Sequence, residues 1–412
     1  MRPELIVAGK EFRDHLTSKR FLAIFAILML VAIIGMATGM DQYNQSLDQY
    51  KTSQAQEQQQ QWFKDEVASL QLQIKQAQAN NLSADNVQAL QQQLESLISP
   101  TMPSVLTVFG GFIDSSTFQG GYFALIMMFL AIALGFDLIT REKEEGSLKS
   151  LLSHPVYRDA VINGKLLGSM AVLVVAMGSV FLVSLAIMLF FGQVPTADDL
   201  LRIISFFVLG LLYGGVFFAI ATLLSTVAKT SAMSMICVLG VIVLLLIVPF
   251  FAPKIADAVL GSPPVAPVGG NGGGVVEPLV DTNTSSNGND AVMGPMIPVT
   301  NTTGPDEAWQ IYSNETTQYY QNEALITDSI NMLSPLYDFG VKIAQPIIYQ
   351  EAASPGGPVM YSDVNLRAIY VNSVPTVWDS IAYVWNSILA LVIMLVAALA
   401  ISYVAFMRTD IR

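Results

Sequence analysis

The clearest chemical pattern in the chain lies between Arg141 and Gly168, in the stretch REKEEGSLKSLLSHPVYRDAVINGKLLG. The hydroxyl of Ser147 can cap a short helix by accepting from an amide one turn on, and Pro155 ends that helix because it has no amide hydrogen. Three leucines between them share one helix face: Leu148, Leu151 and Leu152. The stretch is too charged to enter a bilayer, so its chemistry is recognition: the apolar face should dock into a partner. The alternative is an ordinary solvated loop.

Catalytic chemistry is not indicated. No G-x-x-x-x-G-K-[S/T] phosphate loop occurs, and the nearest string, at Gly164 and Lys165, lacks the upstream glycine and the hydroxyl. No nucleophile–base pair stands out, and His15 and His154 are far apart in sequence with no cysteine cluster near them. We therefore expect no catalytic residue, no metal and no cofactor in this chain, and no ATP hydrolysis by it.

The composition is that of a polytopic membrane protein. Hydrophobic residues make up 53% of the 412 positions and charged residues only 13%. A bilayer needs about 20 apolar residues in a helix, and charge-free windows of that length occur at 21–40, 115–136, 166–197, 203–228, 230–253 and 380–407. We predict an all-α fold with six transmembrane helices. The third window is long enough to include a turn around Gly192 and Pro195.

The distribution of charge predicts the orientation. Thirteen of the 20 Lys and Arg residues fall in the N-terminal stretch 1–20, in the loops before the third and fifth helices, and in the tail 408–412. Because basic loops stay cytoplasmic, both termini are predicted to be cytoplasmic, in a cell membrane. Most acidic residues lie on the other side, so the net charge of −12 belongs to the outer segments and does not indicate a nucleic-acid partner. Residues 4–17 alternate apolar and basic character at helical spacing, which predicts that the segment 1–20 is a helix lying at the lipid interface.

The charged stretch resembles the first cytoplasmic loop of ATP-binding-cassette (ABC) permeases of the type-2, mostly exporter, class. That family shows Glu-x-Glu-x-Gly-Thr, then leucines, a proline, a basic residue and Gly-Lys. The resemblance implies a coupling helix in the loop 140–165 that touches a separate ATPase subunit, which carries the ATP and Mg²⁺. The residues that match, with serine for threonine at one position, are Glu142, Glu144, Gly146, Ser147, Leu148, Leu151, Leu152, Pro155, Arg158 and Lys165.

The resemblance extends beyond this loop. The family has an interfacial helix before its first span, often with a pair like Lys10 and Glu11, and a short cytoplasmic turn after a small-residue-rich helix, here with Ser225, Lys229 and Ser231. The stretch NMLSPLYDFG at 331–340 is similar to an element that the family carries before its last span, where half-buried re-entrant helices occur. Because ABC ATPases work in pairs, the resemblance also implies two permease halves, which we expect to form a homodimer; the alternative is that a different permease chain supplies the second half.

Two outer segments separate these spans. Residues 41–118 are glutamine-rich, with apolar residues at helical spacing before and after a turn at 80–86, which predicts a helical hairpin. It could pack on itself, on a dimer mate or on a third protein. In the second segment, 252–379, residues 261–306 are rich in Gly, Pro, Asn and Ser and are predicted to be a flexible loop. From Asp306 an apolar pattern predicts a helix that ends near Ser334.

Five Asn-x-Ser/Thr triplets all lie in these outer segments. They begin at Asn44, Asn81, Asn283, Asn301 and Asn314 and are possible glycosylation sites, although chance in Asn-rich loops explains them equally well. The lone cysteine, Cys237, excludes a disulfide within the chain. The large outer segments leave a second function open, a membrane-anchored scaffold or receptor whose hairpin binds another protein. The spans are nearly free of ionisable groups, which argues against an ion-coupled transporter.

Overall fold

The computed structural model describes residues 3–59, 61–79, 90, 103–113, 121–146, 158–265, 305–349 and 376–408. Within these ranges the chain is helical and contains no β-strand. Six helices are long and apolar enough to cross a membrane, which confirms the predicted number: Lys19–Thr52, Gly121–Glu145, Arg158–Phe190, Ala197–Val227, Ser231–Leu260 and Trp385–Arg408. The chain is therefore a multi-pass membrane protein of the all-α class.

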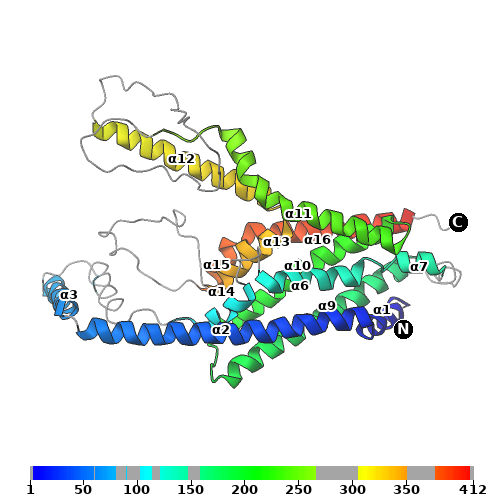
Figure 1. Cartoon of the computed structure of the whole chain (residues 1–412), viewed down its shortest axis with the longest axis horizontal. Helices are drawn as coiled ribbons and strands as arrows, with labels where there is room; N and C mark the ends of the chain where they lie inside the picture. The colour runs from blue at the N-terminus through cyan, green and yellow to red at the C-terminus, as the bar shows by residue number, and fades with distance from the viewer. Residues whose placement is uncertain are drawn as a thin grey trace, which may run out of the picture. The chain divides into compact units, whose positions relative to one another are not determined.

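Helix α1 (Pro3–Leu16) and the last turn of α16 (Trp385–Arg408) lie at the same end of the bundle, which we call the terminal end (Figure 1). Helix α9 (Arg158–Phe190) runs from there to the opposite, far end and turns at Gly192, whose φ of 77° places it in the left-handed region. Thr196 and Asp199 then form a capping box that starts α10 (Ala197–Val227). The turn predicted inside the third apolar window is thus confirmed.

Helix α2 (Lys19–Gln59) differs from the prediction in length. It does not end with its apolar residues near position 40 but continues unbroken for 41 residues. Glutamine has a good helix propensity, which explains why the polar continuation stays helical. After it, α3 (Gln61–Ala79) carries the first half of the predicted hairpin. The second half lies outside the described residues except for Leu90, so the hairpin stays a prediction.

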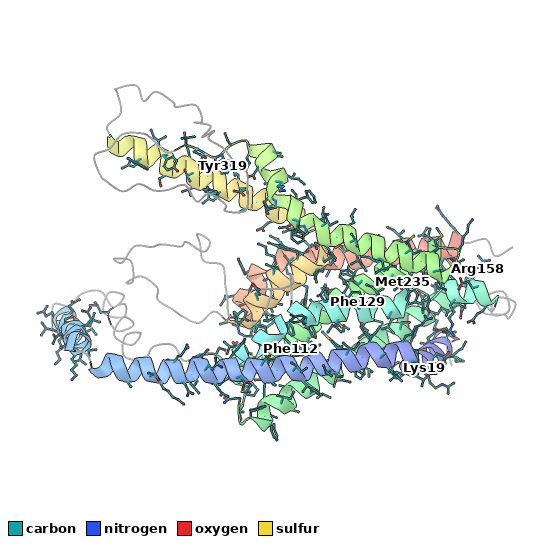
Figure 2. The ribbon with its side chains drawn as sticks, in the orientation of Figure 1. Lys19, Phe112, Phe129, Arg158, Met235 and Tyr319 are labelled. Atoms are coloured by element: carbon teal, nitrogen blue, oxygen red, sulfur yellow. The ribbon has the colours of Figure 1, made fainter. Side chains whose placement is uncertain are left out.

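The core of the first compact unit, residues 1–246 and 332–412, is built around α10. Before α6 (Gly121–Gly135), the short helices η1 (Val105–Phe109) and α5 (Gly110–Ile113) pack on α2. They lie so close that a Cβ on Gly39 would stand 1.8 Å from the carbonyl oxygen of Val108. The close approach in the first span is therefore made with a segment of the same chain. Figure 2 shows the labelled Phe112 beside α2.

A second short segment also packs into this core. It comprises α13 (Pro335–Tyr337), the π-helical stretch η2 (Asp338–Ile343) and α14 (Ala344–Ile348), with the hydroxyl of Ser334 capping its start. Phe339 stacks on Tyr213 of α10 with ring centroids 4.7 Å apart. Asp338, in the same turn, has no exposed surface. The structure thus places a carboxyl group in the core that the sequence had assigned to an outer segment.

Apolar side chains also cover much of the outside of the bundle. Large exposed hydrophobic residues lie on α2, on α11 (Ser231–Leu260) and on α16, for example Ile27, Ile34, Ile236, Leu244, Ile393 and Ile401. A soluble protein would bury such faces, whereas hydrocarbon chains of lipids solvate them. The fold is therefore that of a protein whose surrounding solvent is the bilayer.

The second compact unit consists of residues 247–331. It contains the end of α11, which carries Pro249 and Pro253 inside the helix, and α12 (Pro305–Asn331). Within this unit the hydroxyl of Tyr319 donates to the carbonyl oxygen of Gly261 at 2.8 Å. The helix predicted from Asp306 is confirmed and ends at Asn331. Most of the predicted flexible loop falls outside the described residues.

Candidate docking site at the terminal end

Two described helices border the loop that the sequence singles out. Helix α7 (Thr140–Glu145) ends at Gly146, whose φ of 68° needs a residue without a side chain. Helix α9 resumes at Arg158, which Figure 2 shows at the terminal end of the bundle. The residues between them lie outside the described ranges, so the docking helix itself stays a prediction. That part holds five of the predicted contacts: Ser147, Leu148, Leu151, Leu152 and Pro155.

Lys165 lies inside the chain. Its ammonium group is 2.6 Å from a carboxylate oxygen of Glu11 and 2.8 Å from one of Glu142, and its side chain is only 2% exposed. A buried ammonium group is costly unless it is paired, and here two carboxylates from different helices pair it. The network joins α1, α7 and α9 at the base of the loop. Glu142 and Lys165, both predicted to contact a partner, are thus held by their own chain.

Helix α1 lies directly on α9 because two glycines of α9 leave room for it. A Cβ on Gly164 would stand 2.7 Å from the carbonyl oxygen of Glu4, and a Cβ on Gly168 would stand 2.6 Å from that of Ala8. These contacts bring Glu11 to Lys165. The outward side of α1 exposes Leu5 and Ile6, each about 60% accessible, which fits a helix lying at the lipid interface.

His15 extends the same network. Its Nε2 atom is 3.7 Å from Glu11. Burial lowers the pKa of His15 below its ordinary value of 6.5, and this effect outweighs the opposing attraction of Glu11 and Asp137. The imidazole is therefore held mainly in its neutral form near neutral pH.

Helix α7 is also fastened to the turn between α10 and α11. The buried hydroxyl oxygen of Ser225 accepts from the amides of Ile139 at 3.0 Å and Thr140 at 3.1 Å. The ammonium group of Lys143 donates to the carbonyl oxygens of Thr226 and Ala228. The base of the loop is therefore attached to α10 and to the turn that follows it, besides α1 and α9.

Glu144 makes the third of these attachments. Its carboxylate accepts from the amide of Ser231 at 3.0 Å and from the hydroxyl of the same residue at 2.7 Å. Ser231 is the first residue of α11. Glu144 was predicted to face a partner protein, and the structure brings both of its oxygens to another helix of this chain.

Sequence reasoning quoted Glu11, Ser225 and Ser231 only as parts of a resemblance and did not pair them with the loop. The pairs are separated by 85 to 154 residues, and no spacing rule connects positions so far apart. One signal was available: Gly164 and Gly168 form a small-xxx-small pair beside Lys165, which indicates a close helix neighbour.

The remaining predicted sites are less informative. Asn44 and Asn314 are exposed on α2 and α12, and the other three glycosylation triplets lie outside the described residues. Among the described residues, no group of three or more His, Cys, Asp or Glu side chains could hold a metal ion.

The described residues therefore form a network of contacts that fixes both ends of the loop at the terminal end of the bundle. It presents the chain that leaves Gly146 and returns at Arg158. A comparison with curated proteins found no match to the chain. A family model described as "ABC-2 family transporter protein" matches residues 5–411.

Proposed function

The chain belongs to the ABC-2 family of transporter proteins, and from that membership we propose that it is the membrane-spanning permease subunit of an exporter driven by a separate ATPase subunit. One observation carries the proposal beyond the family: four helices converge on the base of the loop 147–157 and hold both of its ends. A solvated loop without a partner does not need its ends to be fixed by several helices, whereas a loop on which a partner exerts force does.

The division of labour follows from the chemistry of the residues. The apolar face of Leu148, Leu151 and Leu152 inserts into a groove of the ATPase, because removing each leucine from water contributes about 1.5–3 kcal/mol. The start of α9, where the loop ends, is held in place by the ion pairs of Lys165 with Glu11 and Glu142. ATP and Mg²⁺ are bound by the partner, since this sequence has no phosphate loop. In the cell the terminal end, with both termini, faces the cytoplasm, where ATP is found.

We further propose that two copies of the chain assemble with two ATPase subunits. One chain supplies one docking loop, and ABC ATPases act in pairs that each need a docking site. A purified complex with two permease and two ATPase chains supports this composition. One permease chain for two ATPases contradicts it.

Replacing Leu151 by aspartate tests the docking role. The carboxylate would be buried without a partner, which adds a desolvation penalty to the lost apolar contact. Leu151→Asp should therefore insert and fold normally but recover at least tenfold less ATPase in a pull-down, equivalent to about 1.4 kcal/mol or more.

The control is Ser150→Asp, which adds the same charge to the loop but off the leucine face. It should recover the ATPase as the unaltered chain does. Equal recovery with Leu151→Asp, or equal loss with Ser150→Asp, would remove the docking face from the proposal.

A further inference from the structure

The contacts of α7 with α10 and α11 form two successive helix caps, in which α10 caps α7 and α7 caps α11. The first amides of a helix lack partners inside the helix and carry the positive end of its dipole. At the start of α7, Ile139 offers no side-chain cap, and the hydroxyl of Ser225 near the end of α10 accepts from that start instead. At the start of α11, the carboxylate of Glu144 accepts from Ser231. Each helix start is thus satisfied by a residue far away in sequence.

These caps lie on the short stretch of chain that joins the second span to the docking loop, whose other end continues directly into α9. Glu144 precedes Gly146, where the described part of α7 ends, by two residues. A displacement of the loop can therefore reach the spans through α7 as well as through α9. Because α7 is capped by α10 and itself caps α11, both helices are bound to follow it.

We infer that Glu144 is a positioning residue that couples α7 to the start of α11, and not a contact for the ATPase. The inference rests on the proposed function. Glu144 is suited to this role because both of its oxygens already bind Ser231, and because its exposed position lets the chain fold without it. Ser225, by contrast, is completely buried, and its removal would leave buried amides without an acceptor.

The lone cysteine provides the readout. Cys237 lies on α11, six residues after Ser231, and is partly accessible. The experiment uses the full chain with its ATPase subunit in lipid nanodiscs. It compares the rate at which N-ethylmaleimide modifies Cys237 without nucleotide and after trapping with Mg-ATP and vanadate. The same samples give the amount of ATPase that co-purifies.

In the unaltered complex, trapping should change the labelling rate of Cys237. Glu144→Ala should keep the ATPase bound but lose this change, and Ser231→Ala, which retains the amide donor, should lose part of it. Glu145→Ala is the matched control: it removes a neighbouring acid whose partner, Arg141 at 3.0 Å, lies on the same helix. It should respond as the unaltered chain does.

Three outcomes overturn the inference alone, and a fourth overturns the proposed function as well. If Glu144→Ala responds normally, the cap does not transmit movement. If it loses the ATPase, Glu144 is a partner contact, as the sequence alone predicted. If Glu145→Ala fails equally, the effect is one of charge. If the unaltered chain does not bind an ATPase at all, the proposed function itself falls and takes the inference with it.

Discussion

Arg202 shows how much a single residue can hold in this fold. The side chain is completely buried, and its guanidinium group donates to Asp198 at 2.8 Å, to the carbonyl oxygen of Ile347 at 3.0 Å and to the hydroxyl of Ser380 at 3.1 Å. It thereby joins α10 to α14 and to α15 (Val377–Tyr383). The planar guanidinium group suits this role because its fixed donors can meet several acceptors at once.

Replacing Arg202 by methionine should lower the free energy of unfolding by about 3 kcal/mol, because buried acceptors lose their donor. The midpoint of thermal unfolding in detergent measures the effect. Arg20→Met is the control: that arginine also pairs with an aspartate, Asp137 at 3.0 Å, but its side chain is 70% exposed. Because the Arg20 guanidinium group remains largely in water, its loss should cost less than that of Arg202, about 0–1 kcal/mol. Equal losses would mean that burial does not set the importance of Arg202.

His15 makes stability depend on pH. Its pKa is lowered in the folded chain, chiefly by burial, while an unfolded chain has the ordinary value of 6.5. Between the two values the unfolded chain binds more protons, so stability should fall as the pH falls below about 6.5. Midpoints of thermal unfolding measured from about pH 7.5 down to about pH 5 should show this slope, and His15→Gln should reduce it.

His154→Gln changes the chain's other histidine, which belongs to the charged stretch between Arg141 and Gly168, and should leave the slope unchanged. A slope that is identical with and without His15 would assign the pH dependence to other groups.

At the scale of elements, the fit of α1 on α9 depends on the lack of a side chain at Gly164. Gly164→Ala would place a Cβ 2.7 Å from a carbonyl oxygen and should cost about 1–3 kcal/mol of overpacking. Gly178→Ala, on the same helix, meets nothing within 4 Å and should be neutral or stabilising, because alanine favours helix. Thermal unfolding of the two variants compares them directly. A neutral Gly164→Ala would show that α1 can shift away from α9 at little cost.

The six spans could be predicted from the sequence, whereas the buried positions of Arg202 and Asp338 could not. Apolar windows free of charge predicted the six spans, because a bilayer imposes length and composition together. The same rule placed Arg202 and Asp338 outside the membrane core, since a window stops at the first charge. The structure continues the helix through Arg202 and folds the segment with Asp338 back into the core. Tertiary pairing satisfies such groups, and local composition does not record it.

The candidate site was likewise predicted only in part from the sequence. The sequence predicted where the docking loop lies and which residues border it. It did not predict that Lys165 is enclosed or that Glu144 caps α11, because both depend on contacts between distant segments. From the sequence alone, a charged residue in a loop is predicted to contact a partner, because its neighbours in space within the same chain are not known.

For the whole molecule, the excess of basic residues predicts that the terminal end is cytoplasmic. Cysteines introduced one at a time in a Cys237→Ala background test this with a membrane-impermeant maleimide. Intact cells should be labelled at Ser53→Cys and Ser286→Cys, and at Ser150→Cys only after permeabilisation. The reversed labelling pattern would contradict the predicted orientation, because it would place the docking loop on the side of the membrane where ATP is not available.

The unbroken length of α2 sets a distance outside the membrane. Its 41 residues extend about 60 Å at 1.5 Å per residue, whereas a bilayer core is about 30 Å thick. The apolar part of α2 ends near position 40, and roughly 28 Å of polar helix follows before Gln59. The polar end of the helix therefore extends well beyond the thickness of the hydrocarbon core. Deleting seven residues from the polar part of α2, close to two turns, would shorten it by about 10.5 Å and rotate the face of each later helix residue by only about 20°.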